Sequence, residues 1–85
     1  MTTSEITEKL KLIVKPYIKN QVAFESLDNK TDFITDLQIN SANLVDVILD
    51  IEEVFNIEID NESMEKMRDV ESALTIIITK LNEKV

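Results

Sequence analysis

The sequence has 85 residues, of which 44% are hydrophobic, with one proline, no glycine and a formal net charge of −8. A chain of this length builds one small core of modest stability, and the lack of glycine disfavours tight hairpin turns, which need residues at positive φ. The absence of cysteine and histidine excludes disulfides, thiolate metal sites, cysteine nucleophiles and the usual histidine base. We therefore expect a single all-α domain spanning residues 1–85.

The distribution of charge and hydropathy bears on location and partners. The first ten residues lack the basic head and apolar run of a signal peptide, and no apolar span is long enough to cross a bilayer. Between Thr31 and Glu65 there are ten acidic residues and no lysine or arginine. Such a field repels nucleic acid and anionic membranes and attracts basic protein surfaces. We expect a cytoplasmic monomer that binds no nucleic acid and does not insert into membranes.

The first helix is predicted from a capping-box spacing over residues 2–5. A helical apolar stripe follows at Ile6, Leu10, Ile13, Val14, Tyr17 and Ile18. Pro16 lies inside this stripe, and proline in a helix interior removes a hydrogen bond and clashes with the preceding turn. We expect a kink or break between Leu12 and Pro16, with the stripe resuming to about Asn20.

A long loop is predicted over residues 22–35, which show no clear period and contain the turn-forming run 26–30. Phe24, Leu27 and Phe33 are expected to hold this loop to the core. The asparagines Asn20, Asn40 and Asn56 are expected at helix ends that glycine often occupies.

A strongly apolar helix is predicted between Leu44 and Phe55, because its apolar residues recur every three and four positions. Ser41 lies just before the first periodic residue, where a helix leaves backbone N–H groups unsatisfied and where its dipole is positive. A phosphate attached to this serine would meet favourable donors. Serine is also among the commonest residues at helix starts, so capping is the simpler alternative.

Two more helices complete the expected fold. Asp60 or Asn61 is expected to cap a short helix reaching about Met67, and Asp69 is expected to cap a final helix that includes residues 76–78. The sequence thus predicts a small four-helix bundle of three longer helices and one short helix, with the long loop between helices one and two.

The stretch from Asp36 to Ile59 resembles the modification-site region of acyl carrier proteins, which carry a 4′-phosphopantetheine arm on a serine in an Asp-Ser-Leu motif. The resemblance extends in one ungapped register through Asp36, Leu37, Ser41, Val45, Asp46, Ile48, Ile51, Glu52, Glu53, Phe55 and Ile59. Two positions depart from the motif, since Asn40 precedes the serine and Ala42 follows it.

The resemblance implies that Ser41 is the covalent attachment site of 4′-phosphopantetheine, transferred from coenzyme A by a phosphopantetheinyl transferase that uses a divalent metal ion. A serine hydroxyl needs a base to become a nucleophile, and the chain has no histidine. We therefore expect a non-catalytic carrier, modified by another enzyme, that holds acyl groups as thioesters on the arm for acyl-transfer and condensing enzymes.

Two further sets of residues follow from the resemblance. The positions expected to meet basic patches on partner enzymes are Asp36, Asp46, Asp50, Glu52 and Glu53. The apolar positions expected to form ordinary core, and as a further hypothesis to part around an acyl chain, are Phe33, Ile34, Leu44, Ile48, Ile51, Ile59, Met64, Met67, Ala73 and Ile77.

Several alternatives remain open at this point. A peptidyl or D-alanyl carrier would use the same arm, although the acidity of the second helix favours the acyl type. An unmodified acidic helical module would only bind a basic protein. A calcium-binding loop is a weaker option, because residues 58–65 lack the alternating ligand spacing and central glycine of such loops. Fatty-acid, polyketide or pigment, and specialised lipid synthesis are all compatible pathways.

Overall fold

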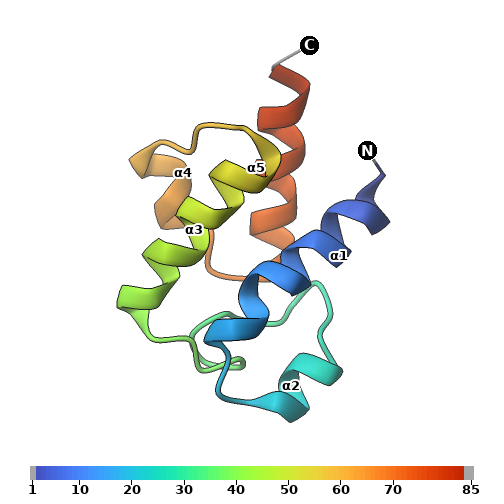
Figure 1. Cartoon of the computed structure of the whole chain (residues 1–85), viewed down its shortest axis with the longest axis vertical. Helices are drawn as coiled ribbons and strands as arrows, with labels where there is room; N and C mark the ends of the chain where they lie inside the picture. Colours follow the sequence, from blue (N-terminus) through green and yellow to red (C-terminus); the bar gives the residue numbers. More distant parts are fainter. Residues whose placement is uncertain (1, 84–85) are drawn as a thin grey trace.

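The computed structural model describes residues 2–83, and the regular secondary structure of these residues is helical apart from one isolated bridge between Asp32 and Asp69. Three longer helices dominate, as the sequence predicts, and short helical segments join them (Figure 1). The elements in order are α1 (Thr3–Val14), the 3₁₀ turn η1 (Lys15–Tyr17), α2 (Gln21–Glu25), α3 (Ser41–Phe55), α4 (Asn61–Lys66) and α5 (Val70–Glu83).

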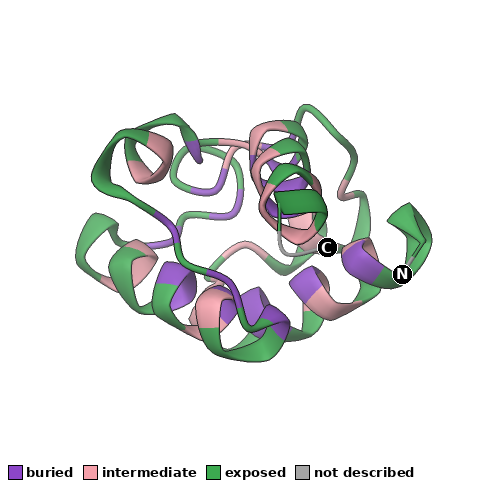
Figure 2. Cartoon of the chain, turned by 90° about the horizontal axis from the view of Figure 1, so that it is seen from above, coloured by how far each residue is buried: buried purple, intermediate pink, exposed green. Residues whose placement is uncertain are grey.

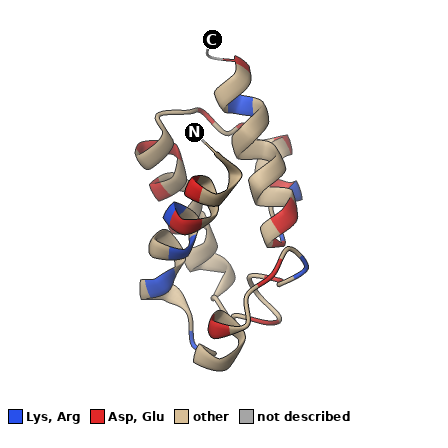
Figure 3. Cartoon of the chain, turned by 90° about the vertical axis from the view of Figure 1, so that its right-hand side faces the viewer, with Lys and Arg blue, Asp and Glu red and all other residues tan. Residues whose placement is uncertain are grey.

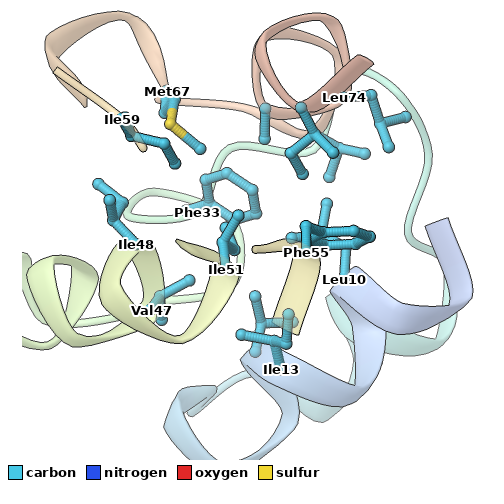
Figure 4. Packing of buried hydrophobic residues seen from close by; sticks show 14 of the residues in the cluster. Leu10, Ile13, Phe33, Val47, Ile48, Ile51, Phe55, Ile59, Met67 and Leu74 are labelled. Atoms are coloured by element: carbon cyan, nitrogen blue, oxygen red, sulfur yellow. The ribbon is translucent and has the colours of Figure 1, made fainter. Parts of the chain in front are cut away.

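The helices form two layers around one hydrophobic core. α1 packs against α3 in one layer, and α4 contacts α5 in the other (Figures 1 and 2). Each long helix turns its apolar stripe inward, and Figure 4 shows Leu10 of α1, Ile51 and Phe55 of α3 and Leu74 of α5 converging between the layers. The inward side of α3 is therefore committed to the core along its whole length.

The first helix begins and ends as its sequence dictates. The Thr2 hydroxyl accepts the backbone N–H of Glu5, and the Glu5 carboxylate accepts the backbone N–H of Thr2, so the predicted capping box is present. α1 ends at Val14, and Pro16 lies in the first turn of η1, where its missing N–H costs nothing. The expected break is confirmed, and the chain is already extended at Ile18.

The predicted long loop contains a helix that the sequence reading missed. α2 forms because the Asn20 side chain accepts the Ala23 N–H at 3.2 Å, while the Asn20 amide donates to the carbonyl of Asp36 at 3.0 Å. A five-residue helix is too short to show an apolar period, so its stability comes from this tertiary contact. Phe24 and Leu27 are half-buried against the core, as expected.

The remaining loop, residues 26–40, is tied to the start of α5. The carbonyl of Thr31 accepts the Val70 N–H, the carbonyl of Asn29 accepts the Glu71 N–H, and the Phe33 N–H donates to the carbonyl of Arg68. The first two of these bonds satisfy backbone N–H groups in the first turn of α5 that a helix leaves open. The loop is therefore a fixed part of the domain that delivers the chain to α3.

The expected helix ends are found, with different roles for the three asparagines. Asp60 caps α4 through the Ser63 N–H, and Asp69 accepts the Ser72 N–H at the start of α5. Only Asn56 takes the left-handed C-terminal position that glycine often fills, with φ 52°. Asn20 and Asn40 instead cap helix N-termini, because their carboxamide oxygens accept first-turn N–H groups.

Candidate functional site

Ser41 is the first residue of α3 and is exposed to solvent. The residue before it, Asn40, is the helix cap, and its side chain accepts the Ala42 N–H at 2.8 Å. Within residues 2–83, the Ser41 hydroxyl makes no hydrogen bond, and the first-turn N–H of Asn43 has no acceptor. The start of α3 therefore does not depend on Ser41 as a cap. The Ser41 hydroxyl faces solvent, close to the backbone N–H of Asn43, which lacks an acceptor.

The loop before α3 fixes where the serine emerges. Asp32 accepts the N–H groups of Ile34 and Thr35, each at 2.8 Å, and its own N–H donates to the Asp36 carboxylate at 2.8 Å. Burial works to raise the pKa of Asp32, but the bonds from Thr35 and Ile34 and the charge of Arg68 outweigh it, so the pKa lies below its ordinary value. This carboxylate is therefore ionised where it holds the turn.

Buried residues flank that turn on its C-terminal side. Leu37 and Ile39 are almost wholly inaccessible, and the exposed residue between them, Gln38, takes a left-handed conformation at φ 58°. Such a conformation is uncommon for a residue other than glycine. The buried side chains of Leu37 and Ile39, one on each side of Gln38, fix the path of the chain into Asn40 and Ser41.

The outward face of α3 alternates apolar and acidic side chains. Val45 and Leu49 are 46% and 53% exposed, and Asp46 and Glu53 are exposed beside them. These residues follow Ser41 at helical spacing, so they form one strip running away from the serine, with Ala42 beside it. Exposed apolar groups bordered by charge are typical of an interaction surface.

Three of the five acidic positions predicted to meet partners also hold the fold together. Asp36 accepts the Asp32 N–H, Asp50 accepts the Tyr17 hydroxyl at 3.0 Å, and Glu52 accepts the Ile59 N–H at 2.7 Å. These internal roles were missed because the bonds follow no periodic sequence pattern: those to Asp50 and Glu52 join separate elements, and the one to Asp36 closes a turn within a loop. Asp46 and Glu53 form no hydrogen bond or ion pair within residues 2–83.

The bond between Tyr17 and Asp50 joins η1 to the middle of α3 and places α1 beside the acidic helix. The hydrogen bond to Asp50 raises the pKa of Tyr17 above its ordinary value, with burial and the charges of Asp50 and Asp46 acting in the same direction. Tyr17 is therefore a neutral donor at neutral pH.

The positions predicted to line an acyl site share one core, with one exception. Seven are buried, namely Phe33, Ile48, Ile51, Ile59, Met67, Ala73 and Ile77. Figure 4 shows Phe33, Ile48, Ile59 and Met67 facing one another between α3 and the segment after α4. Leu44 and Met64 are half-buried and pack against this cluster. The prediction that Ile34 belongs to the core is wrong, because its side chain is 37% exposed. The turn held by Asp32 directs the side chain of the neighbouring Phe33 into the core and leaves that of Ile34 at the surface.

A hollow on the surface lies elsewhere, at the C-terminal end of α3. This open groove of about 850 Å³ is lined by Glu52, Asn56, Ile57, Glu58, Ile59, Asp60, Lys80 and Glu83. It shares only Ile59 with the predicted acyl positions. The seven buried positions have almost no exposed surface, so an acyl chain could reach them only if side chains moved apart.

Residues 2–83 offer neither a metal-binding cluster nor a membrane-spanning helix. No cluster of three or more acidic, histidine or cysteine side chains is arranged to hold a metal ion. None of the helices in that range is both long enough and apolar enough to span a bilayer.

Comparison with known proteins gives the chain a family. No family model matches the sequence. Curated acyl carrier proteins match it over almost its whole length: the one from Coprothermobacter proteolyticus is 31% identical over 84 residues, covering 99% of this chain and 100% of the relative. The chain belongs to the acyl carrier protein family. The acyl carrier protein of Thermosynechococcus vestitus is 36% identical, covering 95% of this chain and 98% of the relative.

A solved structure extends the agreement to the fold. An acyl carrier protein from Enterococcus faecalis superposes with a TM-score of 0.77 at 24% identity, covering 94% of this chain and 99% of that one. Members of this family are non-catalytic carriers that typically carry phosphopantetheine and serve partner enzymes, so the predicted carrier class is confirmed.

Proposed function

We propose that this acyl carrier protein bears its 4′-phosphopantetheine arm on Ser41 and shuttles acyl intermediates as thioesters on that arm. The observation that carries the proposal is the separation of two roles at the start of α3, where Asn40 caps the helix and the Ser41 hydroxyl faces solvent without a partner. A serine that served only as a cap would be bonded to first-turn N–H groups.

The surroundings of Ser41 suit a phosphodiester. The serine lies at the positive end of a fifteen-residue helix, and the Asn43 N–H is open to an acceptor. Asn40 stands where the motif has aspartate, so one negative charge fewer faces the phosphate. The thiol at the end of the arm would supply the sulfur that this cysteine-free chain lacks.

The outward strip of α3 is the proposed docking surface for the transferase and for acyl-transfer and condensing enzymes. Asp46 and Glu53 are free to meet basic side chains, while Asp36, Asp50 and Glu52 add charge from positions fixed by internal bonds. Electrostatic contacts of this kind speed encounter and weaken with salt. They suit a carrier that must bind and leave several cytoplasmic enzymes.

The cargo that we propose for the arm is an acyl group. The acidity of α3 favours acyl over peptidyl or D-alanyl groups, and Asn40 and Ala42 favour a specialised carrier over a primary fatty-acid carrier. The buried positions around Ile48, Ile59 and Met67, with Leu44 and Met64 at the edge, would part to shelter a chain. Loading assays with acyl, aminoacyl and alanyl donors separate these cargo classes.

The deciding experiment is transfer of the arm in vitro. The purified apo-protein is incubated with coenzyme A, a divalent metal ion and a phosphopantetheinyl transferase, and its intact mass is measured. We expect the wild type to gain one arm and Ser41→Ala to gain none. Ser4→Ala is the matched control, because Ser4 is also exposed in the first turn of a long helix. Modification of Ser41→Ala, or no modification of the wild type by any transferase tried, would refute the proposal.

A further inference from the structure

The connection between α3 and α4 is held by one acidic residue of α3. The Glu52 carbonyl accepts the backbone N–H groups of Asn56 and Ile57, and the Glu52 carboxylate accepts the N–H of Ile59 at 2.7 Å. A carboxylate that accepts an N–H forms a charge-assisted bond, which is stronger than a bond between neutral groups. Asp60 then begins α4 as its cap. Glu52 therefore fixes the connection from Asn56 to Ile59.

Ile59 links this bond to the core. Its side chain is buried, and Figure 4 shows it facing Ile48, Phe33 and Met67. Ile48 and Glu52 are four residues apart on α3, so they are neighbours on one side of the helix. The N–H of Ile59 thus binds the turn of α3 next to the one that its side chain faces. The Glu52 carboxylate thereby sets the position of one wall of the buried region proposed to shelter the acyl chain.

The Glu52 carboxylate can be reached from outside the molecule. Glu52 is half-buried, and it lines the open groove at the C-terminal end of α3 together with Ile59 and Lys80. Figure 3 shows acidic segments in the connection at this end of the molecule, beside the last turns of α5. In the part of the chain that the structure describes, no lysine or arginine pairs with Glu52. A positively charged side chain of another protein can therefore enter the groove and bind this carboxylate.

We propose that Glu52 is a positioning residue that couples docking of a partner enzyme to release of the acyl chain, an inference that rests on the proposed carrier function. In the free carrier, the carboxylate holds Ile59 against Ile48 and keeps the buried region closed. An arginine of the docked enzyme binds both carboxylate oxygens in a fork. This pairing draws the carboxylate into the groove and away from the Ile59 N–H. Ile59 then moves, and the acyl chain leaves the core.

The other acidic positions of the proposed docking surface do not offer this coupling. Asp46 and Glu53 make no hydrogen bond or ion pair within residues 2–83, so a cation that binds them displaces no internal contact. Asp36 and Asp50 accept bonds from residues outside the buried positions proposed for the acyl chain. Of the five, Glu52 alone bonds a residue of that buried region.

The first test uses the full-length apo-protein, so its result does not depend on the arm. Amide hydrogen exchange at Ile59 is followed by NMR. We expect exchange to be about tenfold to a hundredfold faster in Glu52→Ala, because a hydrogen bond to a charged group is lost. Glu52→Gln keeps an acceptor oxygen and should accelerate exchange less. If Glu52→Ala does not fold, Glu52→Asp, whose side chain is shorter, replaces it. Glu53→Ala is the matched control and should leave exchange at Ile59 unchanged, whereas equal rates in the wild type and Glu52→Ala would overturn the proposal.

The second test measures release of the chain. A phosphopantetheinyl transferase loads the carrier from octanoyl coenzyme A, and a thioesterase then hydrolyses the thioester at several carrier concentrations. Glu52→Gln keeps Ile59 held but attracts arginine less, so it should lower kcat several-fold. Glu52→Ala frees Ile59 before docking, so it should raise KM and retain the wild-type kcat. Glu53→Gln removes a docking charge alone and should raise KM with kcat unchanged.

The two Glu52 variants separate this role from simpler ones. A purely structural role would change kcat in the same direction in both variants, and electrostatic docking alone would raise KM in both and leave kcat unchanged. Either result would overturn the coupling. Failure of the wild type to accept the arm would instead refute the proposed function. The two failures are distinguishable, because exchange at Ile59 in the apo-protein shows independently whether Glu52 holds the connection.

Discussion

The two faces of α3 divide the work of this protein. The inward face, with Val47, Ile48, Ile51 and Phe55, is buried against α1 and α5. The outward face begins at the exposed Ser41 and carries Asp46, Leu49 and Glu53 into solvent. The contrast shows how a small carrier combines the two roles: one side of a single helix builds the fold, and the other side is left free for chemistry and recognition.

The largest expected difference between the faces is in stability. Ile51→Ala removes a side chain that is only 1% exposed and should lower the free energy of unfolding by about 2–5 kcal/mol. Leu49→Ala, two residues away on the exposed side, should change it by less than about 0.5 kcal/mol. Urea unfolding followed by circular dichroism measures both. If Ile51→Ala does not fold, Ile51→Val should lower the free energy of unfolding by about 0.5–1.5 kcal/mol. Equal losses of stability at positions 51 and 49 would contradict the difference between the two faces.

The second prediction separates the helix cap from the serine beside it. Asn40→Ala should lower the free energy of unfolding by about 1 kcal/mol, because the Ala42 N–H loses its acceptor. Asn40→Ser keeps a capping oxygen and should retain most of the stability. Ser41→Ala should change it by less than about 0.5 kcal/mol. The same urea unfolding measurement applies, and a larger loss for Ser41→Ala than for Asn40→Ala would reverse the assignment of the cap.

The third prediction concerns the turn that leads into α3. Asp32→Asn keeps an acceptor oxygen but loses the charge, and it should lower the free energy of unfolding by about 0.5–1.5 kcal/mol at neutral pH. Because the folded pKa of Asp32 lies below 3.8, the stabilisation is complete above that value. It is lost as the pH falls through the folded pKa.

Unfolding curves of the wild type and Asp32→Asn measured across this pH range check the sign. The two proteins should converge at low pH. A stability difference that stays constant from neutral to strongly acidic pH would show that the charge of Asp32 contributes nothing.

The smallest expected effect is on recognition by the outward face. Asp46→Lys with Glu53→Lys should slow transfer of the arm roughly threefold to tenfold at low salt by reducing electrostatic steering. The difference should shrink as salt is raised. Glu25→Lys with Glu71→Lys, which alters the net charge equally at exposed positions outside α3, is the control for transferase kinetics. Equal slowing by both pairs would assign the effect to net charge alone.

Most of the fold follows from the sequence because its signals are local. The capping box at Thr2, the proline at position 16, the caps at Asp60 and Asp69 and the apolar stripe of α3 each act within one or two turns. Acyl carrier membership was likewise predicted from one ungapped stretch around Ser41, and the curated relatives confirm it.

What the sequence did not reveal depends on hydrogen bonds that follow no helical period, some between distant residues and some within a single turn. α2 is stabilised by the bond from Asn20 to the Asp36 carbonyl, and the placement of α1 beside α3 involves the bond from Tyr17 to Asp50. The exposure of Ile34 results from a turn built by Asp32, two residues earlier. Glu52 was predicted to meet partner enzymes, but its carboxylate also accepts the Ile59 N–H. None of these partners can be identified from periodicity alone.

The central claim is that the one hydroxyl left free at the start of α3 becomes the covalent link to the arm. Fragmentation mass spectrometry of the modified wild-type protein locates the added group on a single residue. The account predicts that every fragment containing Ser41 carries the full added mass and that fragments lacking it carry none. Added mass on any other serine or threonine would contradict it.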